Sequence, residues 1–204
     1  MAETSARDVK LIQYLNEAYG KEKELETALQ AHIAMTTRAP YKKRLQTHLK
    51  ETKAHSRAVE RRIKQLGGSD MIAQTLNAVQ AAAAKGLATA KGPLHALRGT
   101  SEPEKMLKNA KTEYWNEAEE IATYTAIETL AEEVGDRETV RLARGIKREE
   151  ERMARFLERQ IPALTKAVVR EEVPADQRDG GRRGSRSASR SRSGGRSRAR
   201  AASR

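Results

Sequence analysis

Apolar residues recur along most of the chain at spacings of three and four, which predicts helices and not strands. Leu11, Leu15, Ala18, Leu25, Leu29 and Ile33 share one face of a helix expected from about Ala6 to Met35. A second helix is expected from near Pro40, a residue favoured in a first helical turn, to the pair Gly67-Gly68, which ends it. Its apolar stripe consists of Leu45, Leu49, Val59, Ile63 and Leu66.

The next segment, Ser69 to Ser101, differs in composition because alanine dominates it. Met71 to Ala90 predicts a closely packed helix that is capped by Ser69 or Asp70 and ended by the pair Gly92-Pro93. Pro93 to Arg98 adds one further amphipathic turn to this expectation.

Two more long helices follow, from about Glu102 to Val134 and from Arg137 to Ile161. The tight connection Gly135-Asp136 separates them. Proline cannot donate a backbone hydrogen bond, so Pro162 should kink or end the last helix, with a short continuation to Val168.

The connections between the four long helices are short, long and short in turn. Two helical hairpins joined by a crossover of about 33 residues match the ferritin-like variant of the four-helix bundle, whereas a plain up-and-down bundle needs no such crossover. We therefore predict an all-α, ferritin-like bundle over residues 1–172 with a long helical crossover.

The helical pattern ends at Val173, and Gly, Arg, Ser and Ala dominate the remainder of the chain. Such a segment buries too little apolar surface to offset the entropy of ordering it, so residues 173–204 are predicted to be a disordered tail. Of the formal charge of +12, most belongs here, because ten arginines and only two aspartates follow Ala175.

Composition supports the helical interpretation and excludes several kinds of site. Aromatic residues make up 3% of the chain, which is unlike a sheet protein. No cysteine is present, which rules out disulfides, thiolate zinc sites and cysteine nucleophiles. With neither a signal-like apolar run nor a membrane-spanning one, we expect a soluble, cytoplasmic protein without a membrane partner.

Several carboxylates project onto the apolar faces of these helices when residues are placed about 100° apart. Glu22 points inward in the first helix. Three glutamates share the inward stripe of the long helix from Glu102 to Val134. In the last long helix, from Arg137 to Ile161, one of Glu149 and Glu150 must point inward. Along the edge of the second helix, His48, Glu51 and His55 form a ladder. The three glutamates of the helix from Glu102 to Val134 are Glu113, Glu117 and Glu120.

Buried carboxylates cost several kcal/mol each unless something neutralises them. Paired iron or manganese ions do so in carboxylate-bridged bundles. The structural alternative is that these glutamates lie at helix edges, solvated or paired with Arg144, Lys147 and Arg148. Both interpretations remain open at this point.

Four short motifs, in matching order between about Leu11 and Leu164, resemble the ferritin-like bacterial stress proteins typified by YciE and YciF. They are Tyr19–Leu25, His48–His55, Glu117–Tyr124 with Leu130–Gly135, and Arg148–Glu151. The resemblance implies a ferritin-like fold, a homodimer or larger homo-oligomer, and a di-iron or di-manganese centre in a stress-linked protein. Carried onto this chain, it implies the ligands Glu22, Glu51, His55, Glu117, Glu120 and Glu150.

Two functions of different classes follow. One is a di-metal protein that oxidises or sequesters iron or handles peroxide, which would make it an oxidoreductase. The other is a non-catalytic, nucleoid-associated or structural protein with a vestigial metal site, whose basic tail binds DNA or RNA by releasing counterions from phosphates. The residues assigned to that contact are Arg182, Arg183, Arg186, Arg190, Arg192, Arg196, Arg198 and Arg200.

Overall fold

The computed structural model describes residues 5–89 and 101–178, which contain five α-helices and one short 3-10 helix. The α-helices are α1 (Ala6–Met35), α2 (Ala39–Gln65), α3 (Ser69–Thr89), α5 (Glu102–Glu133) and α6 (Arg137–Glu172), and the 3-10 helix η1 covers Ala175–Gln177. No strand occurs among these residues, which confirms the all-α prediction. The turn predicted over Pro93 to Arg98 lies outside the described residues.

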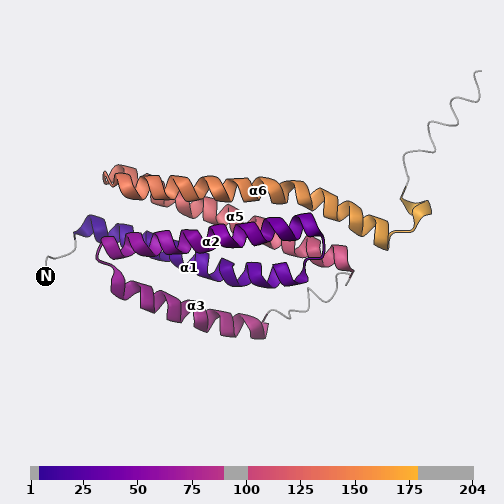
Figure 1. Cartoon of the computed structure of the whole chain (residues 1–204), viewed down its shortest axis with the longest axis horizontal. Coiled ribbons are helices and arrows are strands. Elements are labelled where there is room, and N and C mark those ends of the chain that lie inside the picture. Colours follow the sequence, from indigo (N-terminus) through magenta and orange to yellow (C-terminus); the bar gives the residue numbers. More distant parts are fainter. Residues whose placement is uncertain (1–4, 90–100, 179–204) are drawn as a thin grey trace, which may run out of the picture.

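Four of the helices form the bundle (Figure 1). α1 and α2 make one hairpin and α5 and α6 make the other, while α1 packs on α5 and α2 packs on α6. α3 lies against α1 and α2, outside the four-helix bundle, as part of the predicted crossover between the two hairpins.

The helix boundaries follow from local chemistry. The side chains of Ser5, Ser101 and Asp136 each accept a hydrogen bond from a backbone N–H in the first turn of α1, α5 and α6. Gly67 and Gly135 adopt positive φ angles of 91° and 74°, a conformation that glycine enters without steric cost and that ends the preceding helix.

The predicted end of the last helix was wrong. α6 continues through Pro162 to Glu172, four residues beyond the expected continuation to Val168. Leu157 and Leu164 are completely buried on either side of the proline, and Val168 packs against the same core. We infer that this apolar packing outweighs the hydrogen bond that Pro162 removes.

The apolar core is divided into two clusters. The first core cluster contains Leu15, Val59, Ile63, Ile127 and Ile146 among its buried residues. The second contains Leu29, Tyr41, Leu45, Met106 and Leu157. On each helix of the bundle, residues of both clusters occur with buried polar residues between them in the sequence. A polar layer therefore lies across the middle of the bundle, between two apolar clusters.

Beyond α6, the structure describes the first six residues of the predicted tail. η1 follows Pro174, and the guanidinium of Arg178 donates to the backbone carbonyls of Val173 and Arg170, each at 2.5 Å. The remaining tail residues, 179–204, lie outside the described part of the chain. Within that part, no helix is both long and apolar enough to cross a membrane.

Candidate metal centre

The polar layer is built from six side chains that come from all four helices of the bundle. None of them is more than 5% exposed. We call this set the Glu/His layer, and it consists of Glu22 from α1, His48 and His55 from α2, Glu117 and Glu120 from α5, and Glu150 from α6.

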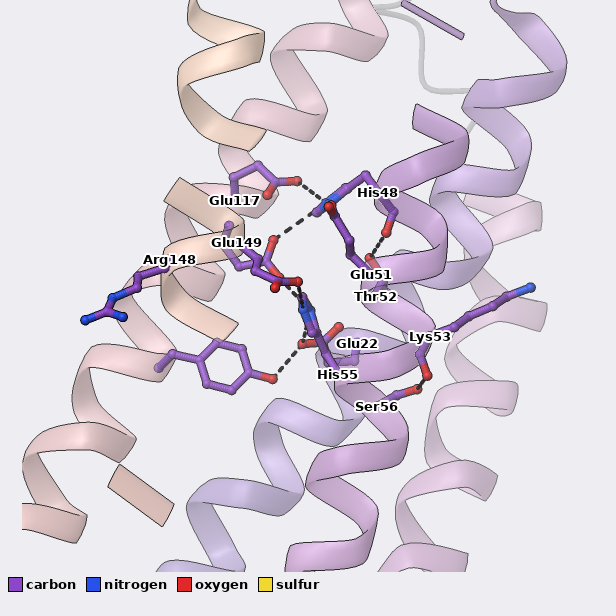
Figure 2. A network of polar contacts seen from close by, with 12 residues as sticks. Glu22, His48, Glu51, Thr52, Lys53, His55, Ser56, Glu117, Arg148 and Glu149 are labelled. Carbon is purple, nitrogen blue, oxygen red and sulfur yellow. Dashed lines mark hydrogen bonds and ion pairs between the residues drawn. The ribbon is translucent and has the colours of Figure 1, made fainter. Parts of the chain in front are cut away.

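Two groups of three residues within this layer could each hold a metal ion. One group is Glu22, His55 and Glu150, and the other is His48, Glu117 and Glu150. In each group the ligand atoms lie within 4.8 Å of one another. Because Glu150 belongs to both groups, its two carboxylate oxygens can serve two neighbouring ions. Figure 2 shows Glu22, His48, His55 and Glu117 pointing toward one another between the helices.

Each of the two imidazoles contacts two carboxylates of the layer. Nε2 of His48 lies 3.0 Å from Oε1 of Glu117 and 3.6 Å from Oε2 of Glu150. Nδ1 of His55 lies 2.8 Å from Oε1 of Glu150 and 3.5 Å from Oε1 of Glu22. These spacings make the two groups neighbours that share one carboxylate.

Many polar atoms of the layer are buried without a hydrogen-bond partner. They are Oε2 of Glu22, Nδ1 of His55, Oε2 of Glu117, and both carboxylate oxygens of Glu120 and of Glu150. The short approach of His55 to Glu150 does not have hydrogen-bond geometry, so both atoms remain in this set. Leaving a buried donor or acceptor unpaired costs about 1–3 kcal/mol, more for a charged group, and a bound cation would remove that cost.

Burial and the mutual repulsion of the carboxylates set the electrostatics. Burial raises the pKa of Glu22 and Glu117, and it raises that of Glu120 well above its usual value with help from the charges of Glu22 and Glu150. Burial opposes the charged form of Glu150 too, but the contacts with His55 and His48 outweigh it and lower its pKa. Four carboxyl groups thus face two imidazoles, and ionising all four would leave an excess of negative charge that bound cations would neutralise.

The pKa values of both histidines are also raised, but here against the effect of burial. Burial alone would lower their pKa values, but the close contacts with carboxylates prevail. Glu117 and Glu51 raise the pKa of His48 to about 10, and Glu150 and Glu22 raise that of His55 to about 11. In the metal-free protein both imidazoles are therefore protonated at neutral pH.

A second set of contacts orients the layer. The hydroxyl of Tyr124 donates to Oε1 of Glu22, and the outer nitrogen of His55, Nε2, lies 2.9 Å from Oε2 of Glu149. Nδ1 of His48 lies 3.2 Å from Oε2 of Glu51. Carboxylates that accept from the outer nitrogen of a histidine ligand set its tautomer and ring orientation.

Glu51, one of the expected ligands, lies outside both groups. Its side chain is 23% exposed, and its Oε2 also accepts from Arg44 at 2.9 Å. The hydrogen bond with His48 and the Arg44 guanidinium outweigh partial burial and lower its pKa to about 2. Glu120 faces the layer without belonging to either group of three.

His48 was not among the predicted ligands. It is completely buried and belongs to the second group. Its position on the ladder of α2, seven residues before His55, was the available signal, because residues seven apart lie on one helix face.

The structural alternative can be compared with the observed ion pairs. Arg144 and Lys147 both contact Glu128, and the exposed Arg148 points away from the layer in Figure 2. Within residues 5–89 and 101–178, no lysine or arginine pairs with the four glutamates of the layer. Within the described residues, those carboxylates therefore lack the lysine and arginine partners that the alternative requires, and their cationic contacts are His48 and His55.

Glu113, also on the inward stripe of α5, is completely buried but belongs to a separate network. Its Oε1 lies 2.6 Å from Nδ1 of His32, and its Oε2 accepts from the hydroxyl of Tyr41 at 2.9 Å. Both oxygens are satisfied by these contacts, so Glu113 differs from Glu117 and Glu120 on the same helix.

The fold and this layer define a ferritin-like helical bundle with a carboxylate–histidine cluster that could hold metal ions. The chain belongs to the family described as a domain of unknown function, DUF892, whose profile matches residues 6–170. No curated protein matches the chain.

Solved structures support the same assignment. A protein from Xanthomonas campestris pv. campestris superposes with a TM-score of 0.63 at 25% sequence identity, covering 81% of this chain and 98% of that one. The E. coli stress protein YciF gives 0.57 at 18% identity, covering 79% and 98%. YcfI from Rhodopseudomonas palustris gives 0.57 at 20% identity, covering 77% and 96%. Together with the family match, the likeness to YciF confirms the resemblance seen in the sequence motifs.

Proposed function

We propose that the Glu/His layer binds two transition-metal ions, iron or manganese, and that the loaded protein oxidises or sequesters iron or handles peroxide in a stress response. The observation that carries this proposal is the set of buried, unpartnered carboxylate and imidazole atoms that converge from four helices. A mixed set of carboxylate oxygens with one imidazole for each ion suits iron and manganese.

Each of the two ions would be held by a different group of residues, with Glu150 common to both groups. Glu22 and His55 would hold one, His48 and Glu117 the other, and Glu150 would lie between them. Glu120 adds a carboxylate without any partner at the edge of the layer. We propose that Glu51, in place of the expected ligand role, orients His48 from outside, as Glu149 orients His55.

Bound iron or manganese would supply the redox chemistry, and the protein would control access and protons. The two core clusters on either side of the layer exclude water along the bundle axis. The hydroxyl of Tyr124 holds Glu22 in place, and the raised pKa of Glu120 makes it a carboxyl group that can carry a proton near the ions.

Metal content provides the test. Full-length protein, freed of metal and then incubated with Mn²⁺ under anaerobic conditions, should retain about two ions per chain by elemental analysis, one for each group of ligands. Glu150→Gln should retain fewer, because both groups lose a ligand. Glu113→Gln is the matched control, since Glu113 is equally buried on α5 but satisfied by His32 and Tyr41. A wild-type protein that takes up no Mn²⁺, or a Glu150→Gln variant that loads like wild type, contradicts the proposal.

The reaction needs a separate measurement. Metal-loaded protein should accelerate either the oxidation of added Fe²⁺ by oxygen or the loss of hydrogen peroxide, and Glu150→Gln should abolish the effect. If the metal-loaded protein is inactive in both assays, a redox role is contradicted and metal storage is the remaining function of the site.

We propose a second function for the tail, namely salt-dependent binding of DNA or RNA that places the protein near the cytoplasmic nucleoid. Residues 179–204, among them the eight arginines assigned to this contact, contain nine arginines and one aspartate. Such a concentration of positive charge favours phosphate backbones without sequence preference. Association into a homodimer or larger oligomer remains a prediction.

A further inference from the structure

A cavity of about 170 Å³ opens between α1 and α5 beside the Glu/His layer. Its outer part is lined by Lys21, Glu24 and Glu119, whose side chains are 36%, 50% and 42% exposed. Its inner part includes Glu120, which is 3% exposed. The cavity therefore leads from the surface to a buried residue of the layer.

Glu120 gives the inner end of the cavity its chemical character. Neither carboxylate oxygen has a hydrogen-bond partner, although both are buried. Glu117 lies one turn away on the same inward face of α5, and the charges of Glu22 and Glu150 act on Glu120 from α1 and α6. An ion that reaches Glu120 is thus next to the ligands of both metal groups.

Lys21 occupies the outer end. Its Nζ lies 2.9 Å from Oε1 of Glu119 and 3.7 Å from Oε2 of Glu24, so one ammonium group bridges two carboxylates from different helices. The same two carboxylates would attract a divalent cation. Exposed ion pairs of this kind are weak, so the ammonium can leave them at little cost.

We propose that this cavity is the route by which divalent metal ions reach the Glu/His layer, and that Lys21 acts as its gate. An arriving cation displaces the Lys21 ammonium from Glu119 and Glu24 and then passes inward to Glu120. This inference rests on the proposed metal-binding function and concerns the rate of loading, while the equilibrium content is determined by the ligands of the layer.

The test measures how fast metal-free, full-length protein takes up Co²⁺, followed by stopped-flow absorption of the bound ion. Lys21→Met removes the positive charge with little change in length, so loading should be faster by about tenfold, in the range of electrostatic effects on association. Ala28→Phe places a large side chain in the cavity and should slow loading. Both variants should reach the same final Co²⁺ content as wild type.

Lys23→Met is the matched control for charge. Lys23 lies two residues further along α1 and pairs with Glu26 at 2.8 Å, outside the cavity lining. Its variant has the same net charge as Lys21→Met and should load at the wild-type rate. Equal acceleration by both variants would indicate a general charge effect and overturn the gate.

The outcomes separate this inference from the proposed function. A wild-type protein that binds no Co²⁺ refutes the metal site itself. A protein that loads normally, but at rates unchanged by Lys21→Met, overturns the route while leaving the site intact. Circular dichroism shows whether Ala28→Phe is folded, and where it is not, the Lys21→Met rate alone decides.

Discussion

The hydroxyl of Tyr124 donates a 2.6 Å hydrogen bond to Oε1 of Glu22, and both side chains are almost completely inaccessible to solvent. The bond connects α5 to α1 at the boundary between the first core cluster and the Glu/His layer. Because one oxygen of Glu22 is held in this way, its other oxygen is the one left without a partner. The phenol therefore orients a carboxylate that we propose as a metal ligand.

Replacing Tyr124 with Phe should weaken metal binding without abolishing it. Loss of an outer-shell partner typically costs about 10–100-fold in metal affinity, and we expect an effect of that size for the ion held by Glu22. Competitive titration of Mn²⁺ against a chelator measures it. Tyr14→Phe is the control, since no hydrogen bond to the Tyr14 hydroxyl occurs within the described residues. Equal affinities for wild type and Tyr124→Phe would show that Glu22 needs no such support.

Metal binding should release protons at neutral pH. His48 and His55, with pKa values of about 10 and 11, are protonated there, and each must lose a proton before its nitrogen can bind a metal. Apparent affinity should therefore rise with pH from 7 toward 10. Calorimetric titration at pH 7.5 in buffers of different ionisation enthalpy counts the protons. A binding enthalpy that is the same in every buffer would contradict this prediction.

Asp136 should stabilise the junction of α5 and α6 only while it is ionised. Its Oδ1 accepts from the backbone of Glu138 and Thr139, and its Oδ2 accepts from Arg62 at 2.5 Å. Burial opposes ionisation, but these hydrogen bonds outweigh it and lower the pKa of Asp136 below the ordinary 3.8. Asp136→Asn should reduce the free energy of unfolding at pH 7 by about 1–3 kcal/mol.

The sign of the pH dependence follows from that lowered pKa. The stabilisation is complete above the unfolded-state value of 3.8 and disappears as pH falls through the lower folded-state value. Urea unfolding at pH 7 and at pH 3 should therefore show a smaller difference between wild type and Asp136→Asn at pH 3. The exposed Asp176 makes Asp176→Asn the control, with no change expected. A difference that grows as the pH falls would refute the assignment.

Deleting residues 179–204 should remove most nucleic-acid affinity. The deletion begins after Arg178 because that side chain donates to two carbonyls near the end of α6 and belongs to the described structure. In gel-shift assays across a salt series, the full chain should bind duplex DNA with a steep loss of affinity as salt rises, and the truncated chain should not. Equal binding by the two proteins would discard the tail as the contact.

Most of the fold could be predicted from helical periodicity and chain breakers. The expected limits of the first helix, Ala6 to Met35, are those of α1, and Gly67 and Gly135, two of the glycines expected to separate helices, adopt positive φ angles. Pro162 was the exception, because its effect depends on partners from other helices. A proline weakens a helix locally, but the buried Leu157 and Leu164 hold α6 to the bundle on both sides of it.

The sequence by itself determined which face of each helix is apolar and that glutamates lie on or beside it, because direction around one helix follows from a turn of about 100° per residue. Only the tertiary structure decided which of them meet. In that structure His48 lies with Glu117 and Glu150. Glu51 lies at the edge of the layer and accepts a hydrogen bond from Arg44. Glu113 contacts His32 and Tyr41. The distance between groups on different helices depends on how far the helices are displaced along their axes. The packing of the two apolar clusters sets that displacement.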